Sequence, residues 1–216
     1  MKSNFKLAPS ILSANFSNLQ SALDICSEGG AHWIHVDVMD NQFVPNLTIG
    51  PPVVKSLRRC TQKFIDVHMM VVEPEKLVEP FARAGADNIT FHYEAASNSE
   101  EVIDLIRSSG CKVGISIKPS TPVNVLSKYL EYIDLILIMT VEPGFGGQKL
   151  MNDQIEKIKK TKELIGNRAI DIEVDGGINT QNAKILIDAG ANVLVSGSTI
   201  FKSKNHQKTI NELRNS

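Results

Sequence analysis

Eight short apolar, β-branched runs alternate with longer amphipathic runs along almost the whole chain. The strand-like runs cover residues 6–12, 33–39, 64–70, 88–93, 112–117, 135–141, 171–174 and 192–196. Helical spacing of apolar residues occurs between them, at residues 18–28, 75–84, 99–108, 153–165 and 180–189. This alternation predicts βα units and a parallel sheet. Eight such units are the number that closes into a (β/α)8 TIM barrel, which is the fold we expect.

Glycines mark the ends of the predicted helices. Gly29-Gly30, Gly85, Gly110 and Gly190 each follow an amphipathic run and precede a strand-like one, and Asn179-Thr180 can cap the helix that follows. A Gly-Ala pair recurs at three of these ends, as a repeated βα unit would produce. An open doubly wound sheet fits the same alternation, but no Gly-x-Gly-x-x-Gly follows the first strand, which weakens that alternative.

The chain of 216 residues is within the size range of one α/β barrel, and no linker or low-complexity run divides it. We therefore expect a single domain over residues 1–216. The net charge of −1, without a basic stripe, argues against a nucleic-acid partner and favours a small-molecule one. No apolar run reaches the length of a membrane span, and residues 1–6 lack the apolar core of a signal peptide. A cytoplasmic protein that does not bind membranes is expected.

Cys26, Cys60 and Cys111 are odd in number, widely spaced and outside any Cys-x-x-Cys pattern. This arrangement predicts neither a disulfide framework nor a thiolate metal site. We expect buried thiols in a reducing compartment.

Polar residues stand at the carboxyl ends of four predicted strands, where barrels of this kind carry their active sites. Ser10 ends the first strand, His35 and Asp37 the second, His68 the third and Asp175 the seventh. Two imidazoles and two carboxylates form a plausible site for Zn²⁺, with Fe²⁺, Mn²⁺ and Co²⁺ also compatible. Spacing alone leaves a second interpretation open, in which His68 is a packed barrel histidine beside the acidic residue two positions before it.

Three glycine-rich segments follow the last three strands, at residues 142–148, 175–178 and 195–198. Glycines let backbone amides approach an anion closely, and the loops after strands seven and eight are the usual phosphate site of such barrels. Each segment alone is explained by a tight turn. Together they predict a phosphate site. Met39, Met70 and Met139 come near strand ends on the inward face, where they could form an apolar wall that excludes water from a carbanion; barrel methionines also commonly serve as core.

Several long motifs occur in a fixed order: Ala8-Pro9-Ser10-Ile11-Leu12-Ser13-Ala14, His35-Val36-Asp37-Val38-Met39-Asp40, Phe43-Val44-Pro45-Asn46, Asp66-Val67-His68, Pro143-Gly144-Phe145-Gly146-Gly147-Gln148 and Glu173-Val174-Asp175-Gly176-Gly177-Ile178. With these motifs the chain resembles the ribulose-phosphate 3-epimerase family from about residue 7 to residue 201. The resemblance implies a ribulose-phosphate-binding barrel, one divalent metal ion and a homo-oligomer. It also implies interconversion of D-ribulose 5-phosphate and D-xylulose 5-phosphate in the pentose phosphate pathway.

Matched position by position, the family's metal ligands correspond to His35, Asp37, His68 and Asp175. Asp37 corresponds to the proton acceptor and Asp175 to the proton donor. The positions that match substrate contacts are Ser10, His68, Asp175, Gly144, Phe145, Gly146, Gly147, Gly176, Gly177, Gly197 and Ser198. The chain departs from the family at Asp40-Asn41-Gln42 and at Glu142, which leaves room for a related substrate such as D-allulose 6-phosphate.

The chemistry of the residues agrees with this resemblance. Epimerisation beside a ketone needs one acid–base group on each side of the carbon and no redox cofactor. A sugar-phosphate decarboxylase of this class would carry Lys at the position of Met39, and an aldolase would need a lysine such as Lys118 at a strand's inner end. A catalytically silent phosphate-binding barrel is a further alternative, although such a descendant would be free to lose the four ligands. We also predict that residues 144–148 close over the substrate.

Overall fold

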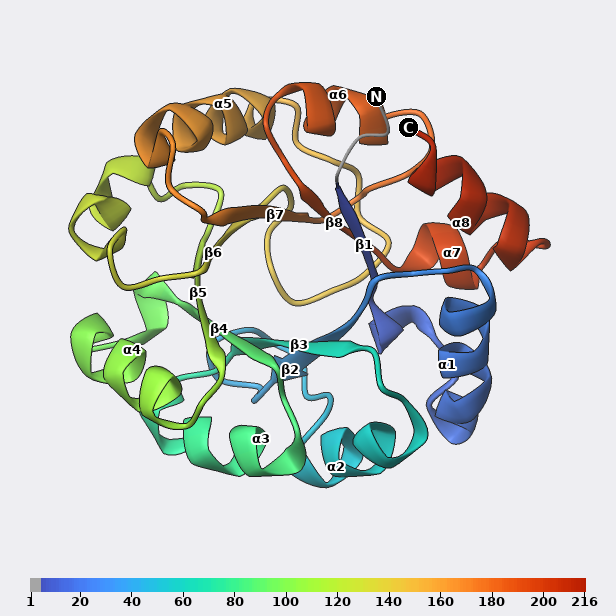
Figure 1. The fold of residues 1–216 in the computed structure, drawn as a ribbon, viewed down its shortest axis with the longest axis horizontal. Coiled ribbons are helices and arrows are strands. Elements are labelled where there is room, and N and C mark those ends of the chain that lie inside the picture. The colour runs from blue at the N-terminus through green and yellow to red at the C-terminus, as the bar shows by residue number, and fades with distance from the viewer. Residues whose placement is uncertain (1–4) are drawn as a thin grey trace.

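A computed structural model describes residues 5–216, and in it a ring of strands is surrounded by helices (Figure 1). The predicted strands are present as β1 (Lys6–Pro9), β2 (Trp33–Met39), β3 (Phe64–Met70), β4 (Asn88–His92), β5 (Lys112–Ile117), β6 (Leu135–Met139), β7 (Asp171–Asp175) and β8 (Val193–Ser196). Their order in the sheet is β1-β8-β7-β6-β5-β4-β3-β2, and every ladder is parallel. The predicted eight-stranded barrel is therefore confirmed.

The ring closes between β1 and β2, where the pairing is sparse. Ser10 and His35 form an isolated parallel bridge, while Leu7 and His32 exchange two hydrogen bonds of 2.9 Å, one of them through His32 Nδ1. β1 ends three residues before the predicted boundary, because Ser10 Oγ accepts from Leu12 N–H and begins a short 3-10 turn, Ile11–Ser13. The closure thus coincides with the first predicted site residue.

Helices form the outer layer in Figure 1. They are α1 (Leu19–Glu28), α2 (Pro51–Cys60), α3 (Val78–Ala84), α4 (Ser99–Ser108), α5 (Gln154–Ile165), α6 (Ala183–Asp188), α7 (Ser198–Phe201) and α8 (His206–Arg214), with a 3-10 segment, Val123–Tyr129, between β5 and β6. The helix predicted from residue 180 begins three residues later, because Asn179 Oδ1 accepts from the N–H groups of Gln181 and Asn182 and turns the chain first. The helix predicted at residues 75–84 is split by a 3-10 turn, Pro74–Lys76, that precedes α3.

Side-chain alternation divides the core into two layers. On β6, Leu135, Leu137 and Met139 point into the barrel, whereas Ile136 and Ile138 pack against the surrounding helices. The interior is apolar along β6, β8 and β1, but β2, β3 and β4 fill it with buried polar side chains. Buried polar groups need partners, so this half of the interior carries a hydrogen-bonded network.

The three cysteines are free thiols, as expected, but their burial differs from the prediction. Cys26 is buried, and burial raises the pKa of its thiol to about 12. Cys60 is exposed, because it ends α2 on the solvent side. Within residues 5–216, none of the helices combines the length and the apolar character that crossing a membrane requires. The predicted lack of a signal peptide concerns residues 1–6, of which the first four lie outside the described residues.

Candidate active site

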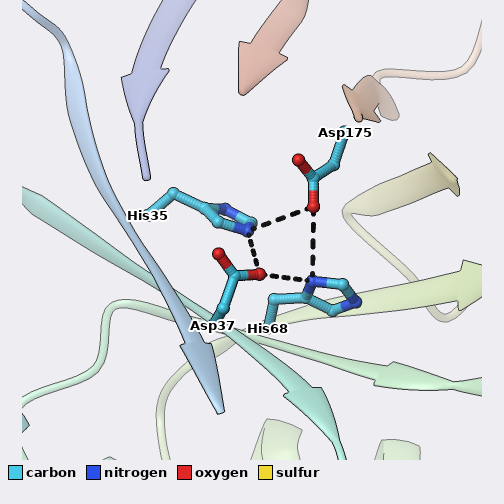
Figure 2. Close-up of side chains that lie close together, drawn as sticks. All are labelled: His35, Asp37, His68 and Asp175. Carbon is cyan, nitrogen blue, oxygen red and sulfur yellow. Dashed lines mark hydrogen bonds and ion pairs between the residues drawn. The ribbon is translucent and has the colours of Figure 1, made fainter. Parts of the chain in front are cut away.

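Four side chains from three strands meet at the carboxyl end of the barrel (Figure 2). His35 and Asp37 come from β2, His68 from β3 and Asp175 from the end of β7. Asp37 Oδ1 lies 3.3 Å from His35 Nε2 and 3.2 Å from His68 Nδ1. Asp175 Oδ2 lies 4.0 Å from His35 Nε2 and 3.9 Å from His68 Nδ1. The four ligand atoms thus surround one point.

The spacing of these atoms fits a divalent metal ion. All four lie within 4.8 Å of one another. Tetrahedral Zn²⁺ with bonds of about 2.0–2.1 Å separates its ligand atoms by about 3.3–3.4 Å, which matches the two Asp37 contacts, while the Asp175 contacts are longer by roughly 0.6 Å. Two neutral imidazoles and two carboxylates are also a donor set that Zn²⁺, Fe²⁺ or Mn²⁺ accepts. The chain therefore has a His/Asp cluster that can hold a metal.

His35 is oriented by a buried carboxylate behind it. Its Nδ1 lies 2.7 Å from Asp66 Oδ2, and Asp66 Oδ1 accepts a 2.7 Å hydrogen bond from Asn88 Nδ2. With Nδ1–H donated to Asp66, the lone pair on Nε2 faces the cluster, which is a usual arrangement for a metal-binding imidazole. Asp66 is thus the hydrogen-bond partner of His35, whereas the sequence analysis considered it as a neighbour of His68.

The two carboxylates of the cluster differ in acidity. Burial opposes ionisation of Asp37, but His35 and His68 outweigh it and hold the pKa of Asp37 below its usual range. Burial and the charge of Asp37 raise the pKa of Asp175 to about 6. Two carboxylic acids in one site with pKa values pushed apart are typical of an acid–base pair. Because they interact, they titrate as a unit.

An open cavity lies above the cluster. Ser10 lines it and donates a 2.5 Å hydrogen bond to Asp37 Oδ2, whereas His35 and His68 are fully buried beneath. The predicted site residues on its wall are Ser10, Asp37, Met39, Met70, Met139, Gly144, Phe145, Gly146, Gly147, Asp175, Gly176, Gly177, Gly197 and Ser198. Asp37, Asp175, the methionines and the three glycine-rich loops therefore share one cavity.

Residues 6–201 match the profile of the Ribulose-phosphate 3 epimerase family. The chain belongs to the ribulose-phosphate 3-epimerase family. It is 47% identical over 220 residues to a ribulose-phosphate 3-epimerase of Synechocystis sp., covering 100% of this chain and 96% of that one. A ribulose-phosphate 3-epimerase of Bacillus subtilis is 45% identical, with 98% and 99% covered. Among solved structures, KGPDC from Streptococcus mutans superposes with a TM-score of 0.72 at 15% identity, covering 97% of this chain and 95% of that one, which supports the barrel fold.

Within this epimerase-family barrel, the structure adds buried acids that the sequence interpretation left unassigned. Glu173 lies two residues before Asp175 on β7, and its Oε1 is 3.5 Å from His35 Nδ1. Burial, with the charge of Asp66, raises the pKa of Glu173, which favours a neutral acid beside a carboxylate. The alternation that placed His35 and Asp37 on one face would have placed Glu173 with Asp175 in the same way.

The lysine that an aldolase would need does not reach the cavity. Lys118 follows β5, and its Nζ lies 4.0 Å from the centre of the Phe43 ring. Lys118 is absent from the residues that line the cavity within residues 5–216. The position where a related decarboxylase carries Lys is Met39, an apolar part of the wall. Neither the lysine that an aldolase needs nor the lysine of a related decarboxylase is therefore on the cavity wall within residues 5–216.

Proposed function

We propose that this chain catalyses the metal-dependent interconversion of D-ribulose 5-phosphate and D-xylulose 5-phosphate by proton transfer at C3. The observation that supports it most directly is the pair Asp37 and Asp175, which face one cavity with pKa values displaced in opposite directions. Membership of the family and the four potential ligands support the same function.

In this mechanism Asp37 acts as the base. Its low pKa keeps it ionised, and the hydrogen bond from Ser10 fixes one carboxylate oxygen while the other faces the cluster. Asp175 returns a proton to the opposite face of the carbon, and its higher pKa suits a donor near neutral pH. The reverse reaction exchanges these roles. Met39, Met70 and Met139 limit water at the carbanionic carbon, so that the proton comes from the acid.

His35, Asp37, His68 and Asp175 would hold the metal ion, for which we propose Zn²⁺, with Fe²⁺, Mn²⁺ or Co²⁺ as alternatives. When bound, a divalent ion supplies positive charge that stabilises the negative oxygens of a cis-enediolate. The phosphate lies at the other end of the cavity, among Gly144 to Gly147, Gly176, Gly177, Gly197 and Ser198, where backbone amides can approach it closely. With the substrate bound at the metal ligands and at the phosphate site, its C3 is held between the two carboxylates.

The test follows the reaction in D₂O by NMR, using Zn²⁺-loaded protein and D-ribulose 5-phosphate. We expect solvent deuterium at C3 together with D-xylulose 5-phosphate, and neither with Asp37→Asn. Deuterium and product that persist in Asp37→Asn would contradict the assigned base. Turnover of D-allulose 6-phosphate in preference to the pentose would reassign the substrate within the same chemistry. Binding of both esters without exchange would favour the silent barrel.

We also propose a cytoplasmic homo-oligomer. Free thiols at Cys26, Cys60 and Cys111 suit a reducing compartment. Two large apolar side chains, Phe16 and Leu47, are 45% and 74% exposed, as surfaces between subunits would leave them in one chain. Light scattering of the purified protein tests the assembly, and a monomer at every concentration would contradict it.

A further inference from the structure

A hydrogen-bonded chain leads away from His68, on the side opposite the cavity. His68 Nε2 lies 2.9 Å from His92 Nε2, and His92 Nδ1 lies 3.2 Å from Glu94 Oε2. His92 is the last residue of β4, and both imidazoles are fully buried. The mechanism above uses neither His92 nor Glu94.

The direction of these hydrogen bonds is set at Glu94. Its Oε1 accepts from the Lys118 backbone N–H at 2.8 Å and from the Thr121 hydroxyl. Burial raises the pKa of Glu94, but hydrogen bonds from His92, Thr121 and the Lys118 backbone outweigh it and lower the pKa to about 2. Glu94 is therefore a carboxylate that can only accept.

A carboxylate at Glu94 determines the protons on both imidazoles. His92 must donate through Nδ1, so its Nε2 carries the lone pair in the neutral ring. That lone pair accepts the proton on His68 Nε2. In the neutral His68 ring the lone pair is then on Nδ1, the atom 3.2 Å from Asp37 and 3.9 Å from Asp175. Each hydrogen bond of this series is thus donated in the direction of Glu94, from His68 to His92 and from His92 to Glu94.

We propose that Glu94 and His92 are positioning residues that hold His68 in the tautomer whose Nδ1 lone pair faces a divalent cation. This inference rests on the proposed function, because it assigns the outer partners of the same metal site. Asp66 accepts the proton of His35 directly, whereas His68 donates to His92, which in turn donates to Glu94. The outer hydrogen-bond partner of a metal-binding histidine fixes its ring and tautomer.

The two imidazoles of this arm are shielded from water. The Phe43 ring packs against His92, with ring centres 4.8 Å apart. Lys118 Nζ lies 4.0 Å from the centre of the same Phe43 ring. Exclusion of water leaves the imidazoles no alternative partner, so loss of one member cannot be repaired by solvent.

Glu94→Gln is the most informative variant, because it replaces one acceptor oxygen by a donor NH₂ without changing the shape of the side chain. The Lys118 N–H and the Thr121 hydroxyl both donate to the Oε1 position, so the amide oxygen is expected to stay there and the NH₂ to face His92 Nδ1. His92 Nδ1 must then accept, and His92 changes tautomer and presents Nε2–H to His68. His68 must then protonate Nδ1. Zn²⁺ affinity, measured by competition with a chromophoric chelator, should fall about 10- to 100-fold.

Ser116→Ala serves as the matched control. Ser116 lies opposite His92 in the β4–β5 register, is buried, and its Oγ has no hydrogen-bond partner within residues 5–216. Ser116→Ala alters the same layer of the interior without removing a hydrogen bond of the arm, and wild-type Zn²⁺ affinity is expected. At His92, Gln retains an acceptor for His68 whereas Leu does not, so His92→Gln should bind Zn²⁺ more tightly than His92→Leu.

The tautomer itself is read in the metal-free protein by two-dimensional ¹⁵N NMR, which is practical with five histidines in the chain. An Nε2–H signal for His68 in the wild type, converted to Nδ1–H in Glu94→Gln, supports the arm. A proton on Nδ1 in the wild type overturns it, as does unchanged Zn²⁺ affinity in Glu94→Gln. Wild-type protein that binds no Zn²⁺ but keeps the Nε2–H tautomer would refute the metal site and support the arm.

Discussion

Asp37 and Asp175 carry the same functional group in different surroundings. Asp37 is 3% exposed, accepts a hydrogen bond from Ser10 and lies within 3.3 Å of both imidazoles, and these neighbours hold its pKa below the usual range. Asp175 lies at the edge of the cavity, where burial and the neighbouring charge favour its acid form. The opposite pKa shifts of the two carboxyl groups therefore come from the partners that the fold supplies and not from the residue type, as the proposed base and acid require.

Asp175→Asn keeps the shape of the side chain and removes its proton. We expect turnover to fall about 10²- to 10⁴-fold, the usual contribution of a general acid or base, while inorganic phosphate still protects the protein from heat. Steady-state kinetics and thermal shifts measure the two effects separately. Near-normal turnover would remove Asp175 from the mechanism.

Glu94 makes stability depend on pH. Its folded pKa is lowered from 4.5 to about 2, so its contribution is fully present above pH 4.5 and is lost as the pH falls towards 2. The difference in unfolding free energy between wild type and Glu94→Gln should shrink by up to about 3 kcal/mol over that range. Denaturant unfolding at about pH 7, 5 and 3.5 checks this, and a difference that stays constant down to the lowest pH would contradict it.

The loop between β6 and α5 is the element that covers the cavity, seen as the gold segment over the barrel interior in Figure 1. Asn46 Nδ2 donates to Gly144 O at 2.8 Å, and Gln148 Nε2 donates to the carbonyls of Glu142 and Phe145. Phe145 is 56% exposed, although it belongs to the cavity wall. A loop that is exposed and held by a few side-chain hydrogen bonds is typical of a segment that can open and close.

Closure of residues 144–148 over the substrate stays a prediction. Asn46→Ala removes the link to Gly144, and we expect a several-fold higher KM with Zn²⁺ affinity unchanged, because the loss affects the loop and not the ligands. Ligand-free and phosphate-bound crystal structures test the movement directly. The same loop position in both would contradict closure.

The turn after β7 packs closely against the end of this loop, where Gly177 lies next to the backbone of residues 148–150. Gly177 has φ 68°, and a Cβ there would lie 2.4 Å from Leu150 N. Gly110 has a similar φ of 83° with nothing within 4 Å of such a Cβ. Gly110→Ala should cost about 1–2 kcal/mol from its backbone conformation, whereas Gly177→Ala should cost more and also raise KM. Equal losses in unfolding free energy would show that the close approach is unimportant.

Sequence periodicity predicted the elements better than their ends and partners. All eight strands and α4 follow from alternation and spacing, because burial on one or both faces dictates residue type. Ser10 ends β1 and Asn179 delays the start of α6 through side-chain hydrogen bonds from the backbone, which periodicity does not encode. His92 and Glu94 were missed because their partners come from β3 and from the turn after β5, and only the folded barrel brings these together.

At the scale of the whole molecule, the cluster links opposite parts of the barrel. His35, Asp37 and His68 belong to β2 and β3, whereas Asp175 belongs to β7, which is separated from them along the sheet by β4, β5 and β6 on one side. On the other side lies the sparse closure between β1 and β2. A cation held by all four side chains would therefore bridge the interior and tie β7 to β2 and β3.

Zn²⁺ should consequently stabilise the entire fold and not one loop. At a free concentration about 100 times its dissociation constant, a ligand that binds the folded state alone adds about 2.7 kcal/mol to the free energy of unfolding. For a chain of this length that corresponds to a rise in Tm of roughly 5–10 °C. Scanning calorimetry with Zn²⁺ and with EDTA measures the rise, and Asp175→Asn, which lacks the β7 ligand, should show a much smaller one. An equal rise in both proteins would place the stabilising ion outside this cluster.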